Sequence, residues 1–488
     1  MKIPEQGRPR ADVLAQLRSF AEADVDWHGG KVWSLVYHAG DEHKEFLAEA
    51  HGAFASTNLL NPMAFKSLKR MESEVVSMTA SMLHGPDDAV GTLTSGGTES
   101  ILLAVKAARD RAKKLRWWVR TPEIVAPMTI HPAFHKAADY FGMKLRRVDV
   151  GDDYRVDLDA LKRAVGRNTV LIAASAPQYA QGVIDPIAEI GAFAQSRSLP
   201  FHVDACFGGF ILPWFERLGE EIAPFDFRVP GVTSISADIH KFGYAAKGAS
   251  LVVYRSMDYL RHQFHVDTDS PVGIYASPTI LGTRPGGPIA AAWSTLNAMG
   301  CDGYLELARR TLDARDRLRD AVASLDGVEV LGRAEGPVVC WRSSDRAVST
   351  YALADQLAER GWGVDRQQNP ASVHCTVTAN HADVVDAYVA DLAAAVAAVR
   401  ANPSLNREGE AAMYGMMAKI PVRGAVRLGV MKVLEAMYAP GGGSPDLGNM
   451  GESEDGLLGL MGRYQDKALD VLERVDDARG KVRTWLED

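Results

Sequence analysis

The stretch SADIHKFGY at residues 236–244 decides the fold, because it places a lysine directly after a predicted strand. The apolar run at 232–236 is typical of a buried strand, so Lys241 follows the end of that strand. A lysine held at such a position can form a Schiff base with an aldehyde cofactor. A lysine on its own is usually a solvated surface residue. The neighbouring segments therefore decide whether Lys241 has a chemical role.

Asp204 ends another predicted strand, in the stretch FHVDACFGG at residues 201–209. Sheets of α/β proteins place ligand-binding groups at the carboxyl ends of their strands. A carboxylate there can pair with the protonated nitrogen of a pyridine ring and strengthen that ring as an electron sink. The alternative is an aspartate that only caps a helix.

A glycine pair and a histidine add two further candidates. In TSGGTES, residues 94–100, Gly96 and Gly97 let the backbone approach a ligand closely, and Thr98 suits a helix N-terminus, whose N–H groups favour a phosphate. His131 begins a predicted helix in TIHPAFHK, residues 129–136, and its imidazole can stack on a cofactor ring. The simpler alternatives are a capped tight turn and a helix-capping histidine.

The alternation of strands and helices predicts the α/β class. Strands are predicted at 90–94, 124–126, 145–150, 170–174, 201–203, 232–236 and 250–254, and helices at 98–115, 131–141 and 186–196. This order favours a largely parallel sheet covered by helices, which forms a large domain over residues 71–298.

The rest of the chain divides into three segments. Residues 1–70 form an N-terminal helical segment, and 299–400 form a smaller α+β C-terminal domain. That domain has a long helix from about Tyr304, strands at 328–331, 338–342 and 373–378, and helices at 351–360 and 382–399. Residues 401–488 form a C-terminal extension, with a linker at 439–456 and a terminal helix at 457–485.

Composition excludes several classes of function. A net charge of −8 and a pI of about 5.9 give no electrostatic reason to bind nucleic acid. The four cysteines show no metal-ligand spacing, which argues against a zinc site and suits a reducing compartment. No apolar run approaches the length of about 20 residues that crosses a bilayer, and the N-terminus lacks the apolar stretch of a signal peptide. We expect a cytoplasmic protein without a membrane span.

Taken in order, the four motifs resemble those of fold-type-I pyridoxal-phosphate enzymes of the group II decarboxylase-like branch. The finer resemblance is to the sphingosine-1-phosphate lyase family, and it covers roughly residues 28–418. It rests on GKVWSLVY (30–37), FASTN (54–58), MESE (71–74), SAPQY (175–179), GVIDP (182–186), HKFGYAAKG (240–248), GTRPG (282–286), VTANH (377–381) and AMYGM (412–416). The YAAKG tail after Lys241 is the most discriminating of these stretches. The resemblance implies a transferase-like large domain with pyridoxal 5'-phosphate as cofactor.

The family also implies a reaction and a role for each matching residue. A phosphorylated long-chain (sphingoid) base would be split between C2 and C3 into a fatty aldehyde and phosphoethanolamine. Lys241 would be the Schiff-base lysine, Asp204 the partner of the pyridine nitrogen and His131 the residue stacked on the ring. The cofactor phosphate would be bound by Gly96, Gly97, Thr98, His240 and Thr283, with Thr283 coming from the other subunit of a homodimer with shared active sites. The substrate phosphate and the proton transfers would be served by Tyr37, Asn58, Asn61, Tyr179 and Lys247.

The sequence departs from the family at one of these positions. Where the family often has a histidine that helps hold the substrate phosphate, NLLNP at 58–62 has Asn61. An amide can donate a hydrogen bond but cannot carry charge. The segment beyond about Tyr438 matches no stretch of the family.

Three other functions stay open at this point. An amino-acid decarboxylase would use the same Lys241, Asp204 and His131, although those relatives usually have PHKW where this chain has IHKF at 239–242. An aminotransferase would need a carboxylate-binding arginine, which has no clear counterpart here. A non-catalytic cofactor-binding or scaffold protein would be expected to lack Lys241 or Asp204, and both are present.

Overall fold

Seven strands lie side by side in the main sheet of the computed structural model, which describes residues 2–419 and 423–440. The chain divides into two units. The larger unit comprises residues 35–344 and 372–385, and the smaller unit comprises the other described residues. The predicted terminal helix at 457–485, and all of the predicted linker except its first two residues, lie outside the described residues.

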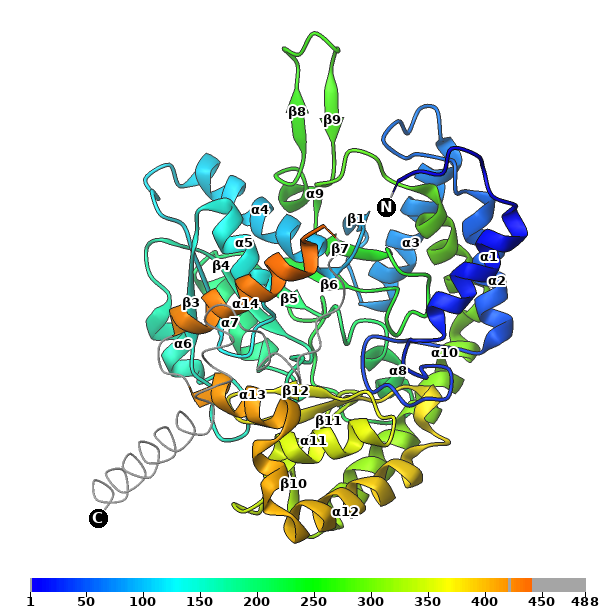
Figure 1. Ribbon diagram of the computed structural model, residues 1–488. Coiled ribbons are helices and arrows are strands. Elements are labelled where there is room, and N and C mark those ends of the chain that lie inside the picture. Colours follow the sequence, from blue (N-terminus) through cyan, green and yellow to red (C-terminus); the bar gives the residue numbers. More distant parts are fainter. Residues whose placement is uncertain (1, 420–422, 441–488) are drawn as a thin grey trace. The chain divides into compact units, whose positions relative to one another are not determined.

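The main sheet belongs to the larger unit and has the order β1-β7-β6-β5-β4-β2-β3 (Figure 1). Its strands are β1 (Val90–Thr94), β2 (Glu123–Pro127), β3 (Lys144–Val148), β4 (Thr169–Ser175), β5 (Phe201–Asp204), β6 (Ser234–Ala237) and β7 (Ser250–Tyr254). The strand pairs β3–β2, β2–β4, β4–β5 and β5–β6 are parallel. β7 pairs antiparallel with both of its neighbours, β6 and β1. The predicted α/β class with a largely parallel sheet is confirmed.

Helices cover both faces of this sheet, because its central strands are apolar on both sides. Alternate residues of β2, and of β4 from Leu171 on, enter two separate hydrophobic clusters, one with Val125, Ile172 and Ala174 and the other with Ile124, Ala126, Leu171 and Ala173. The second cluster also contains α4 (Gly97–Leu115) and α5 (Ala133–Phe141), and the first contains α7 (Ile187–Ser196) and α8 (Leu212–Arg217). The period of two along each strand therefore fixes which helices cover which face.

The larger unit also holds further elements around the sheet. Its other helices are α2 (Asp41–Ala53), α3 (Lys66–Met82), α6 (Leu158–Ala164), α9 (Met257–Leu260), α10 (Gly286–Ser324) and the short η1 (Ala379–His381). α10 is broken at Gly300, where φ is 56°. The long helix predicted from about Tyr304 is therefore preceded by another helical part, which begins at Gly286. The sequence analysis did not predict that part, because glycines at its start disfavour a helix. An antiparallel sheet contains β10 (Val328–Leu331), β11 (Val338–Ser343) and β13 (Ser372–Thr376).

A hairpin of β8 (His265–Asp267) and β9 (Tyr275–Ser277) stands out from the rest of this unit in Figure 1. It exposes three large apolar side chains, Val266, Val272 and Ile274. The sequence analysis did not predict this hairpin, because its two strands have only three residues each.

The smaller unit is mainly helical. It contains α1 (Arg10–Ala21), α11 (Thr350–Glu359), β12 (Asp365–Gln367), most of α12 (Val385–Ala401), η2 (Pro403–Arg407), α13 (Gly409–Lys419) and α14 (Arg423–Tyr438). Trp33 and Trp362 pack against Tyr388, with ring centroids 4.7 and 5.1 Å away. In the described part of the chain, no helix is both long and apolar enough to span a bilayer.

Candidate active site

Five strands of the main sheet end at one cavity. Parallel strands bring their carboxyl ends to the same edge of a sheet, where α/β proteins bind ligands. The segments that follow β1, β2, β4, β5 and β6 all contribute to a cavity of about 650 Å³. Its lining includes Tyr37, Gly96, Gly97, Thr98, His131, Tyr179, Asp204, His240, Lys241 and Lys247. The fold thus brings together ten residues that the sequence analysis selected.

Lys241 is paired with a carboxylate that the sequence analysis did not select. Its Nζ lies 2.9 Å from Oδ2 of Asp238, whose side chain is 2% exposed. Burial alone would lower the pKa of Lys241, but Asp238 outweighs this effect and raises the pKa well above its ordinary value. Burial alone would raise the pKa of Asp238, but Lys241 and His240 outweigh it and lower the pKa. Lys241 is therefore protonated here and must lose a proton before it can act as a nucleophile.

Asp204 lies at the end of a buried polar chain. Its Oδ1 accepts hydrogen bonds from the backbone N–H of Cys206 (3.1 Å) and from Oγ of Ser236 (3.3 Å). Ser236 Oγ is also 3.2 Å from Nε2 of His202. Burial lowers the pKa of His202 to about 4, so this imidazole is neutral at pH 7. Because Ser236 donates to Asp204, its oxygen accepts the Nε2 proton of His202, and the chain of hydrogen bonds fixes the orientation of the Asp204 side chain.

The turn at Gly96 and Gly97 is closely packed, and at Gly97 it has no room for a larger side chain. A Cβ on Gly97 would lie 2.8 Å from both Oδ2 of Asp238 and Sγ of Cys206. A Cβ on Gly96 would lie 3.7 Å from Cε1 of His240. α4 begins at Gly97, so the first N–H groups of this helix point toward the cavity end of β1, where they can bind an anion.

Aromatic side chains form another part of the cavity wall. Tyr37 lies edge-on to Phe242, with centroids 5.0 Å apart, and Tyr179 lies edge-on to Phe207, at 5.9 Å. Nδ1 of His131 accepts a hydrogen bond from the N–H of Ala133 at 3.2 Å, so the neutral ring carries its proton on Nε2.

Lys247 is the second lysine at the cavity. Its Nζ donates to the carbonyls of Leu35 (2.8 Å) and His240 (3.2 Å) and lies 4.8 Å from the ring centroid of Tyr37. Burial of the ammonium, together with the charge of Lys241, lowers the pKa of Lys247 to about 8. Both protonation states of this amine are therefore accessible near neutral pH.

Three selected residues, Asn58, Asn61 and Thr283, do not line this cavity in the same chain. Oδ1 of Asn58 accepts from the N–H groups of Leu60 (2.9 Å) and Arg284 (3.0 Å). Oδ1 of Asn61 accepts from two N–H groups of the turn that follows it, each at 3.1 Å. Thr283 is exposed. Asn58 and the residues beside Thr283 thus form a separate group, outside the Lys241 cavity.

Sequence reasoning missed Asp238, Phe207 and His374. Asp238 stands three residues before Lys241 in the same loop, and that spacing was the available signal. Phe207 lies under Lys241, with Nζ 5.7 Å from its ring centroid. His374 stacks on Tyr179 from β13, and nothing local in the sequence indicates this contact.

The residues present fit pyridoxal phosphate. The cavity offers an amine for the aldehyde, a buried carboxylate for the ring nitrogen and a glycine turn at a helix N-terminus for the phosphate. In addition, Oδ1 of Asp238 is buried without a hydrogen-bond partner among the described residues. A bound molecule with a hydrogen-bond donor at this point of the cavity would satisfy that oxygen.

Comparisons with known proteins agree with this chemistry. The profile of the pyridoxal-dependent decarboxylase conserved domain matches residues 2–344. Sphingosine-1-phosphate lyase 1 of Rattus norvegicus is 43% identical over 417 residues, which cover 85% of this chain and 73% of the relative. The corresponding lyase of Arabidopsis thaliana is 41% identical, with coverages of 88% and 79%.

Solved structures extend the comparison to the fold. The sphingosine-1-phosphate lyase of Burkholderia pseudomallei superposes with a TM-score of 0.82 at 36% identity, covering 90% of this chain and 98% of that one. A glutamate decarboxylase from Lactobacillus brevis shares the fold with a TM-score of 0.71 at 22% identity. The chain belongs to the pyridoxal-dependent decarboxylase family and, within it, to the sphingosine-1-phosphate lyases, which are pyridoxal-phosphate enzymes.

Proposed function

We propose that this protein cleaves a phosphorylated long-chain base between C2 and C3, giving a fatty aldehyde and phosphoethanolamine. The observation that carries the proposal is the second lysine of the cavity, Lys247, beside Tyr37 and six residues after Lys241 in the stretch most typical of these lyases. A cationic amine next to a phenol suits a phosphorylated substrate. Similarity to lyases over most of the chain supports the same reaction.

The residues that would hold the cofactor follow from their positions. Lys241 would hold its aldehyde carbon, Asp204 its ring nitrogen, and His131 the face of its ring. Gly96, Gly97, Thr98 and His240 would hold its phosphate. When bound, the cofactor supplies an electron sink for the negative charge that develops on C2 as the C2–C3 bond breaks.

The remaining residues would act on the substrate. Cleavage requires removal of the proton from the C3 hydroxyl. Tyr37, Tyr179 and Lys247 line the cavity, and each can donate to a phosphate or transfer a proton. With its pKa lowered to about 8, Lys247 is suited to both roles.

We further propose a homodimer with shared active sites. The matching residues fall into two groups on one chain: ten line the Lys241 cavity, whereas Asn58, Asn61 and Thr283 lie outside it. A second copy that presents Asn58, Asn61 and Thr283 to this cavity would complete the set. We place the enzyme in the cytoplasm, as no disulfide joins its four cysteines.

An amino-acid decarboxylase is the second candidate, because the matching family profile is that of decarboxylases. Such an enzyme would have to accommodate the carboxylate on the α-carbon of its substrate, and arginine is the side chain best suited to bind a carboxylate. Among the described residues that line the cavity there is no arginine, which favours the lyase.

Product analysis separates the two functions. The purified enzyme, loaded with pyridoxal phosphate, is incubated with sphinganine 1-phosphate and, separately, with a panel of amino acids. Fatty aldehyde and phosphoethanolamine in equal amounts are expected from the first incubation. Carbon dioxide from an amino acid, without aldehyde from the phosphorylated base, would overturn the proposal.

A further inference from the structure

Glu99 joins the Gly96–Gly97 turn to the segment that carries Thr283. Its side chain is 7% exposed and lies in the first turn of α4. Oε2 accepts from both the N–H and the Oγ of Ser95, each at 2.7 Å. Oε1 accepts from the N–H groups of Ile280 (3.0 Å) and Leu281 (3.3 Å). One carboxylate thus holds two segments that are far apart in the sequence.

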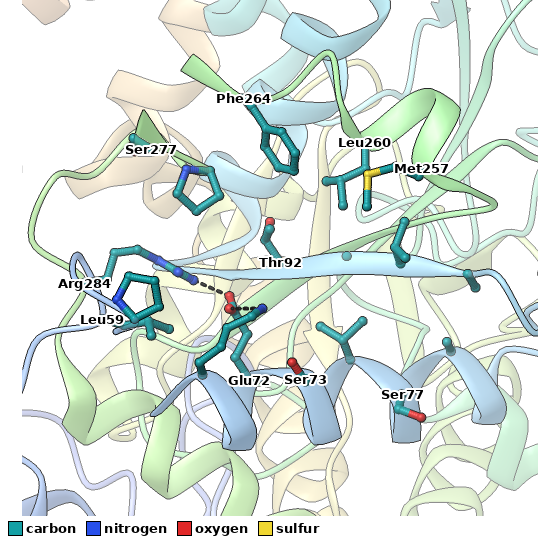
Figure 2. Close-up of a pocket in the computed structure, with 18 of the residues that line it drawn as sticks. Leu59, Glu72, Ser73, Ser77, Thr92, Met257, Leu260, Phe264, Ser277 and Arg284 are labelled. Carbon is teal, nitrogen blue, oxygen red and sulfur yellow. Dashed lines mark hydrogen bonds and ion pairs between the residues drawn. The ribbon is translucent and has the colours of Figure 1, made fainter. Parts of the chain in front are cut away.

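A second anchor holds the other end of the Thr283 segment. Arg284 and Glu72, which are 6% and 2% exposed, form an ion pair at the wall of a cavity of about 780 Å³, where Figure 2 shows them facing each other. Arg284 also donates to the carbonyl of Leu93 at 3.1 Å, and Glu72 accepts from the N–H of Leu93 at 3.1 Å. Both ends of the segment are therefore fixed to the body of the larger unit, while Thr283 between them is exposed.

The bonds of Glu99 leave the helix N-terminus available to an anion. A glutamate at this helical position commonly accepts from the backbone just before the helix, and here it accepts from Ser95. The N–H groups of Gly97 and Thr98 have no acceptor one turn earlier within the helix. A phosphate would bind the N–H groups of Gly97 and Thr98, while the Glu99 carboxylate binds Ser95 just before them. Both anions would then fix the same turn.

We propose that Glu99 is a positioning residue that couples the two cofactor sites of the dimer. Through Ser95 it fixes the phosphate turn of its own site, and through Ile280 and Leu281 it fixes the segment whose Thr283 serves the neighbouring site. The inference rests on the proposed cofactor site and homodimer. Because four donors converge on one carboxylate, neither segment can shift without losing charge-assisted hydrogen bonds.

Hydrogen exchange of the dimer with and without pyridoxal phosphate tests the coupling. In the wild type, cofactor binding is expected to slow exchange at the amides of Ile280 and Leu281, although they bind Glu99 and not the cofactor. Glu99→Gln is expected to abolish this response and to weaken cofactor binding roughly tenfold, the loss of about one charge-assisted hydrogen bond. The matched control is Glu74→Gln, which replaces a more exposed carboxylate that binds Arg70 and Trp293. It should behave as the wild type.

Hybrid dimers test the effect on the neighbouring site. One protomer is wild type, and the other carries Glu99→Gln together with Lys241→Ala, so the remaining Lys241 belongs to the protomer with an intact turn. That site would receive its Thr283 segment from the variant protomer. Its affinity for pyridoxal phosphate, measured from the borohydride-reduced adduct on Lys241, should be several-fold weaker than in a hybrid with Lys241→Ala alone.

The outcomes separate this inference from the proposed function. A wild-type protein that forms no adduct on Lys241 contradicts the proposed function itself. A normal adduct on Lys241 combined with equal affinities of the two hybrids, or with no cofactor response at Ile280 and Leu281, overturns the role of Glu99 alone. If Glu99→Gln does not fold, Ser95→Ala removes only one of the four donors and should show a smaller loss of the same exchange response. An unchanged response in Ser95→Ala would then count against the coupling.

Discussion

The imidazole of His374 is stacked on the phenol ring of Tyr179, with centroids 4.1 Å apart and planes inclined by 21°. His374 is fully buried, and its Nε2 is 2.7 Å from Oγ1 of Thr376 while its Nδ1 is 3.4 Å from the carbonyl of Ala180. Since a carbonyl only accepts, Nδ1 carries the proton and Nε2 accepts from Thr376. A ring from the second sheet thus holds a tyrosine at the wall of the cavity.

His374 should act on catalysis through Tyr179. We expect His374→Ala to lower kcat/KM roughly tenfold and His374→Phe, which keeps a stacked ring, to lower it less. In a Tyr179→Phe background the further loss from His374→Ala should shrink, because both changes act on the same group. Steady-state kinetics of the four variants and their unfolding temperatures provide the measurement. Fully additive losses in the double variant would contradict this role.

Gly97→Ala should weaken cofactor binding without unfolding the protein. The added Cβ would lie 2.8 Å from Asp238 and Cys206, so the turn must move away from them. We expect a loss of at least tenfold in affinity for pyridoxal phosphate, measured by titration of the apoenzyme. Gly52→Ala in α2 is the matched control, since nothing lies within 4 Å of its Cβ position. Normal affinity in Gly97→Ala would show that this turn does not bind the cofactor.

The Lys241–Asp238 pair should dominate the pH dependence of stability at the cavity. The pKa of Asp238 is lowered, so its contribution is present above the ordinary carboxyl pKa and is lost as the pH falls through the lowered value. The pKa of Lys241 is raised, so its contribution is present below the ordinary lysine pKa and is lost only as the pH rises through the raised value. The pair therefore stabilises the fold across neutral pH.

Asp238→Asn should accordingly destabilise the apoenzyme by about 3 kcal/mol at pH 7, because it leaves a buried ammonium unpaired. The loss should decrease toward pH 10, where that ammonium deprotonates. Urea unfolding between pH 6 and 10 gives the measurement. Lys241→Met in the Asp238→Asn background should recover much of the stability, and a loss independent of both pH and Lys241 would show that the ion pair is not its cause.

Lys247 should set the alkaline limit of the reaction. As the pH rises through about 8 the ammonium loses its charge, so kcat/KM for a phosphorylated substrate should fall above that pH. Lys247→Met should lower kcat/KM by roughly 10- to 150-fold and abolish the fall of kcat/KM at alkaline pH. If Lys247 binds the substrate phosphate, the dephosphorylated analogue should show neither effect, whereas equal losses on both substrates would assign Lys247 to the proton transfer, the cofactor or the fold. Asn61→His should strengthen the preference for the phosphorylated substrate, as it adds a group that can carry charge.

Complementation should reveal which residues cross between subunits. Mixing Lys241→Ala with Thr283→Ala protomers should restore activity, because one hybrid site combines an intact lysine with an intact Thr283 from the other chain. Mixing Lys241→Ala with Tyr37→Phe should restore none, since both residues line one cavity of the same chain. Activity of the mixtures at matched protein concentration is the measurement. Recovery in the second mixture would place Tyr37 across the interface.

Residues that follow a strand were the predictable part of this site. Lys241 and Asp204 come directly after apolar runs, and parallel pairing brings such positions together at one sheet edge. The stack of His374 on Tyr179 joins segments that no local pattern connects. The antiparallel direction of β7 could not be predicted from the sequence either, because a buried strand has the same apolar pattern in either direction.

The location of the Lys241 cavity has a consequence for how new specificities can arise on this scaffold. Backbone pairing and buried apolar residues fix the strands, whereas Tyr37, Tyr179 and Lys247 belong to the connecting segments beyond them. Such segments can be exchanged without disturbing the strand register. Grafting the loop 242–248 onto a decarboxylase of the same fold, or replacing it here, would therefore alter substrate choice while the inherited framework and its cofactor chemistry persist.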